Sequence, residues 1–287
     1  MADVALTFDF DAMSLWIGSY RQTDLGVVSR GEFAPTGVGR VLALLERHEV
    51  RATFFVPGHT ALTYPDCVRA IVAGGHEVGH HGFVHERLSE LSPDRELAVL
   101  KRGIEVLENV AGARPVGYRS PSWEMTAETV RLLTEHGFLY DSSLMGSDFH
   151  PYWLRSGDRL HAEEAYHFGA QVPVVEIPVS WLLDDFPHFE YVPRGAGPSA
   201  MKPPSQVYEI WWEEFDYFHS LQQGGCFTLT MHPEVIGRGS RLRMLDELVG
   251  AMRQRSGVRF APLAEVAQAW RAAQPRRSSA AGEGHGR

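Results

Sequence analysis

The chain alternates between short apolar runs and longer segments whose apolar residues recur every three or four positions. The first pattern is typical of buried strands and the second of amphipathic helices. In the segment 37–48, for example, Val38, Val41, Leu42 and Leu45 would share one helix face. The predicted strands are 4–10, 51–56, 76–80, 117–119, 138–140, 174–178, 226–231 and 259–262, and the predicted helices are 37–48, 65–73, 94–111, 126–136, 205–222, 240–255 and 263–272.

Strands that alternate with helices predict an α/β fold with a parallel sheet. About seven such units favour a closed or nearly closed (β/α) barrel over an open sheet, with the chemistry at the C-terminal strand ends. We expect one domain over residues 1–274. The segments 146–172 and 184–204 do not fit the repeat, and long loops of this kind are usually functional or contact partners. The tail 275–287 is expected to be disordered.

Composition and charge narrow the classes of function. With 44% apolar and 22% charged residues, the chain resembles an ordinary globular protein. A net charge of −9 without a basic block argues against binding to nucleic acid or to acidic membranes. No apolar run approaches the ~20 residues that a membrane span needs. Two cysteines, Cys67 and Cys226, and no export leader before the first strand predict a reduced, cytoplasmic protein.

Two carboxylates, Asp9 and Asp11, end the first predicted strand. Side chains two positions apart on a strand share a face, so both should point into one space, which favours a bound cation or a proton between them. His81 and His85 would share one face of a helical turn. Asp11, His81 and His85 are therefore the predicted ligands of a catalytic metal ion with one open position. His80 competes with His81, and the spacing to His85 favours His81.

The other polar residues at the strand ends suit proton transfer. Asp9 is the candidate general base for a metal-bound water. Arg119 would hold Asp9 ionised and fix its direction. His232 follows another strand and suits a general acid that protonates the leaving nitrogen. Either Asp184 or Asp185 would orient His232, and the sequence does not decide between them.

These motifs resemble, in order, those of the polysaccharide deacetylase family, the NodB-homology group of carbohydrate esterases. The matching stretches are 7–11, 81–85, 119–123 and 229–232. Three positions depart from the usual pattern: Phe10 separates two aspartates that are usually adjacent, Gly82 replaces Ser or Thr, and Ser122-Trp123 replaces Tyr-Gly. The variants resemble a cytoplasmic branch that includes a bacterial peptidoglycan deacetylase, cyclic imide hydrolases and metal-independent allantoinases.

The resemblance implies a distorted (β/α) barrel and one divalent metal ion, most often zinc. It implies metal-assisted removal of an acyl group from an amide nitrogen, with the roles named above for the base, the ligands and the acid. A backbone N–H near Ser122 would help to form the oxyanion site. The branch also implies a homotetramer whose long loops cover the site. The candidate covering residues are Trp16, Tyr20, Trp153 and Trp181, although isolated aromatic residues are more often core or interface residues. Substrate contacts are expected from Trp16, Tyr20, His59, Ser122, Trp123 and Trp181.

Three functions are compatible with these residues. The first is a deacetylase of N-acetylated amino sugars, which the likeness to a peptidoglycan deacetylase favours. The second is a hydrolase of small cyclic amides, such as a cyclic imidase or an allantoinase-like enzyme, which the missing export leader favours. A covered, aromatic pocket would suit small rings, and a long open groove would suit glycans. The third is a non-catalytic barrel that binds a small ligand, and the complete set of acids and histidines argues against it.

Overall fold

The central element is a nine-stranded sheet with the order β6-β7-β5-β4-β3-β2-β1-β8, in which β9 pairs with the first residues of β1. The computed structural model describes residues 2–192, 201–221, 224–274 and Arg276. Every strand pair is parallel except β6–β7. The strands are β1 (Ala2–Asp9), β2 (Thr53–Val56), β3 (Glu77–His80), β4 (Gly117–Tyr118), β5 (Tyr140–Asp141), β6 (Tyr152–Ser156), β7 (Ala170–Glu176), β8 (Cys226–Met231) and β9 (Val258–Phe260).

The sheet curls into a half-barrel, which confirms the distorted α/β barrel but not a closed one. Within the described chain, β6 and β8 are the two edges and do not pair with each other. The outer edge of β8 is covered by irregular chain instead. Asp184 forms a bridge to Thr230, and the Asp185 N–H donates to the Thr230 carbonyl at 3.0 Å. This covering segment brings the two aspartates beside the end of β8.

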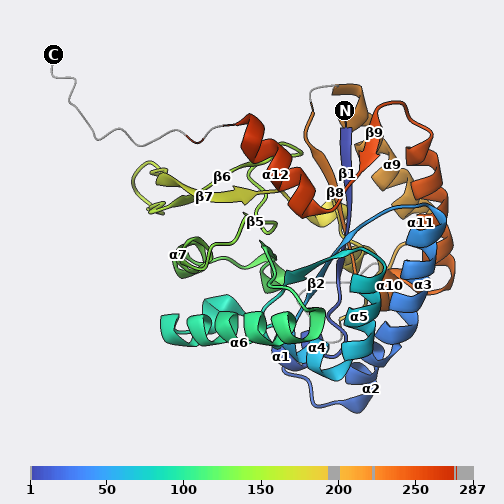
Figure 1. Ribbon diagram of the computed structural model, residues 1–287, viewed down its shortest axis with the longest axis horizontal. Helices are drawn as coiled ribbons and strands as arrows, with labels where there is room; N and C mark the ends of the chain where they lie inside the picture. Colours follow the sequence, from blue (N-terminus) through green and yellow to red (C-terminus); the bar gives the residue numbers. More distant parts are fainter. Residues whose placement is uncertain (1, 193–200, 222–223, 275, 277–287) are drawn as a thin grey trace.

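Helices cover the outer face of the sheet, with α3, α9 and α11 beside β1 and β8 (Figure 1). One helix, α12, packs Leu263, Val266 and Ala267 against the inner face. The helices are α1 (Ser14–Gly18), α2 (Leu25–Val28), α3 (Ala34–Arg47), α4 (Gly58–Thr63), α5 (Pro65–Ala73), α6 (Pro93–Ala111), α7 (Ala127–Glu135), α8 (Phe186–Phe189), α9 (Pro204–Leu221), α10 (Pro233–Ile236), α11 (Gly239–Arg253) and α12 (Leu263–Ala273), with 3-10 turns at η1 (Ser29–Phe33), η2 (Leu88–Glu90), η3 (Pro121–Trp123) and η4 (Trp181–Leu183).

Alternation along β1 decides which side chains reach the barrel interior. Leu6 and Phe8 belong to the outer core beneath the helices, whereas Ala5 packs on the inner face with α12. Because successive strand side chains point to opposite faces, Thr7 and Asp9 share the inner face with Ala5. Thr7 and Asp9 are buried there, at 0% and 3% exposure.

The local signals for helix ends are confirmed. The Thr126 side chain accepts a hydrogen bond from the Thr129 N–H and caps α7. The helix α6 begins with Pro93 at its first position, where a missing N–H costs nothing. It ends at Gly112, whose φ of +76° is the left-handed conformation that glycine adopts without strain.

Several elements differ from the prediction. The segment 146–172, expected to be a loop, contains β6 and the start of β7, an antiparallel hairpin. The first residues of β7 are exposed, so their sequence lacks an apolar run. Short helices α1, α2, α4 and α8 were not predicted because one turn gives too little periodicity to detect. The expected disordered tail 275–287, Arg276 apart, lies outside the described residues.

No helix within the described residues is long and apolar enough to cross a lipid bilayer. Both cysteines are free thiols.

Candidate active site

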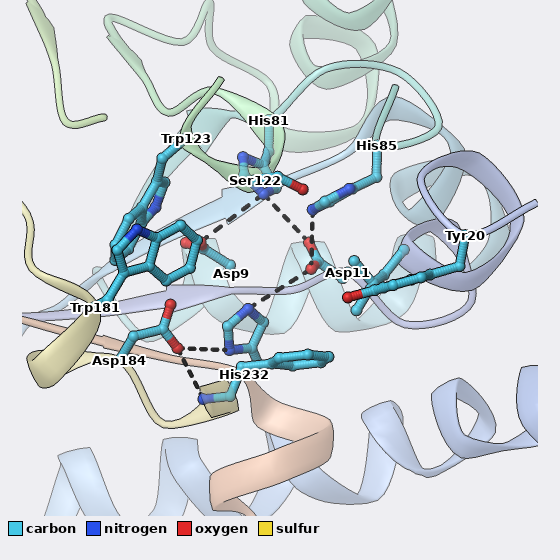
Figure 2. Close-up of a pocket in the computed structure, with 12 residues that line it drawn as sticks. Asp9, Asp11, Tyr20, His81, His85, Ser122, Trp123, Trp181, Asp184 and His232 are labelled. Carbon is cyan, nitrogen blue, oxygen red and sulfur yellow. Dashed lines mark hydrogen bonds and ion pairs between the residues drawn. The ribbon is translucent and has the colours of Figure 1, made fainter. Parts of the chain in front are cut away.

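The side chains predicted to carry chemistry gather at the C-terminal ends of β1, β3, β4 and β8 (Figure 2). Asp11 and His81 are 0% and 1% exposed, and Arg119 and His232 are 0% and 7% exposed. The C-terminal ends of parallel strands meet at one rim, where the sequence placed these residues. Burial of so many ionisable groups is costly unless they are paired, so their contacts decide what the site can do.

Asp11, His81 and His85 form a cluster that fits a divalent cation. The Asp11 oxygens lie 3.4 Å from His81 Nε2 and 3.3 Å from His85 Nε2. Tetrahedral ligands at zinc distances lie about 3.3 Å apart, which is this spacing. Both Asp11 oxygens are buried and have no hydrogen-bond partner among the described residues. Burial by itself would raise the pKa of Asp11. The neighbouring histidines, His85 above all, lower it by more than burial raises it, so the pKa lies below its usual value and the carboxylate is ionised.

Contacts behind the two imidazoles turn their Nε2 atoms toward Asp11. His81 Nδ1 lies 2.7 Å from the Arg119 carbonyl, which can only accept a hydrogen bond. His85 Nδ1 lies 2.6 Å from Ser19 Oγ, whose own hydroxyl donates to the His85 carbonyl at 2.8 Å. Both Nδ1 atoms therefore carry the proton, and both Nε2 lone pairs are left for a cation. Burial lowers the pKa of His81, which favours the neutral form that metals bind.

The segment 81–85 is an irregular loop, so the predicted helical turn is wrong. Gly82 has φ +70° and His85 has φ +58°, both left-handed. The Glu86 carboxylate holds the loop by accepting two backbone N–H groups at 2.9 and 3.0 Å. These reversals bring the two rings to 5.0 Å between centroids. The positive φ of residue 82 also explains why that residue is glycine.

His80 points away from the cluster, so the geometry favours His81 as the sequence did. The His80 ring stacks on Tyr118 at 5.3 Å, and its Nε2 lies 3.1 Å from the Leu100 carbonyl. Burial lowers the pKa of His80 to about 3, so the ring is neutral and belongs to the packed interior.

Arg119 fixes the direction of Asp9. Its guanidinium donates to Asp9 Oδ1 and to Thr7 Oγ1, both at 2.8 Å. It also donates to the Ser142 carbonyl and Ser142 Oγ, both at 2.9 Å, and lies 4.3 Å over the Phe55 ring. One Asp9 oxygen is thus occupied, while the other, Oδ2, lies 3.8 Å from His81 Nε2. Asp9 therefore presents a free oxygen to the space beside the three-residue cluster.

His232 faces the cluster from beside Asp11. Its Nδ1 lies 2.7 Å from Asp185 Oδ1, and its backbone N–H also donates to that carboxylate. Its Nε2 lies 3.7 Å from Asp11 Oδ2. Asp184 is 3.8 Å from the ring and accepts the Phe186 N–H at 2.8 Å. The structure thus places Asp185, not Asp184, in the orienting position that the sequence left open.

The carboxylates around His232 raise the pKa of its imidazole. Burial lowers the pKa of His232, but the charges of Asp185, Asp184 and Asp11 together raise it well above its usual value. Burial raises the pKa of Asp184 to about 7, and the His232 charge works against that rise. The three carboxylates thus favour the protonated form of His232, whose Nε2 is directed toward Asp11.

Aromatic side chains wall a pocket of about 410 Å³, its mouth included, over these groups. Trp123 and Trp181 stand on one side, with ring centroids 4.0 Å apart, and Tyr20 on the other (Figure 2). Ser122 and Trp123 have φ +53° and +56°. Two consecutive non-glycine residues in the left-handed region carry strain of a kind that clusters at functional sites. Ser122, Trp123, Trp181 and Tyr20 thus line the pocket as expected.

Three residues expected at the pocket lie elsewhere. Trp16 is buried behind Tyr20, stacked on its ring at 5.3 Å, so it supports the wall without lining it. His59 does not line the pocket, and its Nδ1 is 3.0 Å from Ser14 Oγ. Trp153 packs against Trp270 in the inner core. The sequence shows that these aromatic residues occur near strand ends but not which way each loop turns.

Sequence reasoning also missed two residues that shape the site. Ser19 orients His85, and nothing in a lone serine at a helix end signals such a contact. Glu234 is buried at 6% exposure, and its Oε1 accepts the Ala12 N–H at 2.8 Å, next to Asp11. An acid two positions after His232 could have been noticed, because it follows the same strand end.

Comparison with known proteins agrees with this geometry. Residues 2–140 match the family described as polysaccharide deacetylase. A peptidoglycan deacetylase of Helicobacter pylori is 34% identical, over 96% of this chain and 98% of that protein. A peptidoglycan deacetylase-like protein of Gibberella zeae is 32% identical, over 82% of this chain and 75% of that protein.

Solved structures show the same fold. A crystal structure from Mycobacterium smegmatis, assigned to the polysaccharide deacetylases, has a TM-score of 0.85 and 38% identity and covers 98% of this chain and 95% of its own. The Puue allantoinase structure has a TM-score of 0.78 at 21% identity, over 96% and 92% of the two chains, a likeness of fold alone. The chain therefore belongs to the polysaccharide deacetylase family, hydrolases that act on carbon–nitrogen bonds.

Proposed function

We propose that this protein is a metal-dependent deacetylase of N-acetylated amino sugars. One observation carries the proposal: the buried Asp11 carboxylate, which has no hydrogen-bond partner among the described residues, lies 3.3–3.4 Å from two imidazole Nε2 atoms. Asp9 lies beside this cluster next to His81, and His232 lies next to Asp11 (Figure 2). A base and an acid beside a cation site are what amide hydrolysis requires.

Asp11, His81 and His85 would hold the ion. Two neutral imidazoles and one carboxylate in tetrahedral spacing suit Zn²⁺, which is the ion we propose. When bound, such an ion supplies a Lewis acid that polarises the amide carbonyl and acidifies a water molecule.

The residues around the ion site would move the protons. Asp9 would take the proton of the attacking water, with Arg119 holding its other oxygen in place. His232 would donate its Nε2 proton to the leaving nitrogen, and Asp185 would keep the ring in the right tautomer. The Ser122 backbone N–H is proposed to stabilise the oxyanion.

The proposal of an amino-sugar substrate is based on the related proteins, whereas the shape of the pocket supports cyclic amides as a second candidate class of substrate. The peptidoglycan deacetylases that resemble this chain support an amino-sugar substrate. The compact pocket walled by Trp123, Trp181 and Tyr20 suits a small ring as well, which favours a hydrolase of cyclic amides as the alternative.

A hydrolysis screen distinguishes the two functions. Purified protein loaded with Zn²⁺ would be assayed on N-acetylglucosamine oligomers for acetate release. It would be assayed on succinimide, phthalimide, dihydrouracil and allantoin for ring opening. The proposal predicts acetate release and no ring opening. Ring opening alone would support the alternative, and hydrolysis of neither class would contradict both.

The pH dependence tests the role of Asp185. The His232 pKa is raised by the Asp185 charge, so Asp185→Asn is expected to lower that pKa. His232 would then lose its proton at a lower pH, and the alkaline limb of kcat/KM would shift to lower pH. Asp184→Asn should shift it less, because Asp184 is farther from the ring. Equal shifts in the two variants, or none, would contradict the assignment.

The homotetramer and the cytoplasmic location stay predictions. Light scattering on the purified protein tests the first.

A further inference from the structure

Two buried acids stand behind Arg119, at the ends of β5 and β7. Asp141 and Glu176 are opposite each other in the strand register, and both are 0% exposed. Because paired residues of adjacent strands project to the same side of the sheet, their carboxyl groups lie next to each other, and the Asp141 charge raises the pKa of Glu176. Neither residue belongs to the pocket lining, and neither touches the predicted metal ligands.

Each acid has one oxygen engaged by other groups. Asp141 Oδ1 accepts the Ser143 hydroxyl at 2.8 Å. Glu176 Oε1 accepts the backbone N–H of Ser143 at 3.0 Å and of Leu144 at 2.8 Å. The remaining oxygens, Asp141 Oδ2 and Glu176 Oε2, are buried and find no donor from another side chain or backbone group in the described chain. Two carboxylates have no proton to donate, so they can bond to one another only if one of them is protonated.

The surroundings do not neutralise two negative charges. Arg119 is close enough to Asp141 to lower the pKa of that acid, but its guanidinium already donates to Asp9. Tyr118 and Tyr152, from β4 and β6, also face the pair, and burial raises the pKa of both phenols. Burial likewise raises the pKa of Glu176, and the adjacent Asp141 raises it further. The surroundings of the pair therefore favour one negative charge on the two acids over two.

The pair holds the turn that grips Arg119. The Ser142 carbonyl and hydroxyl accept two of the guanidinium hydrogen bonds. Ser143 Oγ, which donates to Asp141, accepts the Ser120 N–H at 2.8 Å, one residue after Arg119. The turn anchored by the acids thus fixes Arg119 through its side chain and through the adjoining backbone.

We propose that Asp141 and Glu176 share a single proton and act as a positioning pair, which holds the 142–144 turn so that Arg119 is aimed at Asp9. The carboxyl of one acid donates that proton to the carboxylate of the other. The effect on turnover rests on the proposed function, because it acts through Asp9. The shared proton itself does not depend on any activity.

Glu176→Gln and Glu176→Ala test the pair. Glutamine keeps the Oε1 acceptor and offers an N–H donor to Asp141, so it replaces the shared proton by an amide. Alanine removes both. We expect Gln to retain turnover within about threefold, and Ala to lower kcat by about 10–100-fold through misplacement of Arg119, with KM and bound metal unchanged. Glu96→Gln, at a buried acid bonded to Thr126 and Thr129, is the matched control and should leave kcat unchanged.

A second readout is independent of catalysis. The infrared difference spectrum of wild type minus Glu176→Gln at neutral pH should show a protonated carboxyl band. Burial and the Asp141 charge raise the pKa of Glu176. Its contribution to stability is therefore fully present below the ordinary carboxyl pKa and is lost as the pH rises from there through the folded-state value. The wild type should lose thermal stability more steeply than Glu176→Gln as the pH rises above the ordinary carboxyl range.

The outcomes separate the two proposals. If no substrate is hydrolysed but the band and the steeper loss of stability with rising pH are present, the proposed function fails and the proton-sharing pair stands. If the band is missing, or if Gln lowers kcat as much as Ala does, the positioning pair is wrong whatever the substrate.

Discussion

Replacing Asp11 by alanine is expected to abolish both metal binding and turnover. Asp11 is the one carboxylate placed between the His81 and His85 Nε2 atoms, and both of its oxygens lack another partner in the described chain. Loss of an outer-shell contact alone costs about 10–100-fold in metal affinity, so loss of a ligand should cost more than about 100-fold. Calorimetric titration with Zn²⁺ and metal analysis of the purified variant measure this. His85→Ala should behave in the same way.

A surface acid provides the control. Asp66→Ala removes a carboxylate whose side chain is 93% exposed, and it should bind one ion per chain as the wild type does. Thermal unfolding separates loss of the site from loss of the fold. Added Zn²⁺ should raise the Tm of the wild type and of Asp66→Ala but not that of Asp11→Ala. An Asp11→Ala protein that binds one ion with unchanged affinity would contradict the ligand assignment.

Asp9→Asn is expected to keep the metal and lose turnover. The amide can still accept the Arg119 hydrogen bond at Oδ1, so the local structure should persist. It cannot take a proton, and the loss of a general base costs about 10²–10⁴-fold. We expect kcat to fall by that factor with KM and metal content unchanged, measured by steady-state assay and metal analysis. Normal turnover by Asp9→Asn would mean that another group is the base.

The gathering of the rim residues could be expected from the sequence because their positions are tied to strand ends. Asp9 ends a buried strand, Asp11 follows it by two positions, and His232 directly follows another strand. The carboxyl ends of parallel strands must meet, so the convergence of these side chains follows from the fold class. The α/β alternation is also indicated by local stop signals at some helix ends, such as Gly112 after α6.

The contacts that tune the site depend on the paths of loops, which have no periodic signal. Asp184 and Asp185 are adjacent, and only the bridge to Thr230 shows which of them reaches His232. In the 81–85 loop, residues in the left-handed backbone conformation bring the two histidines together, and no helix is involved. The sequence does not show that Glu176 is buried, because an acid at a strand end can equally well be exposed.

Anomalous diffraction at the zinc edge, from crystals grown with Zn²⁺, would locate the ion. We expect one ion bonded to an Asp11 oxygen, His81 Nε2 and His85 Nε2, each at about 2.0–2.2 Å. An ion bound instead by Asp184, Asp185 and His232, the other cluster of potential ligands in the described chain, would show that the ligand assignment is wrong. So would the absence of any ion between Asp11 and the two histidines.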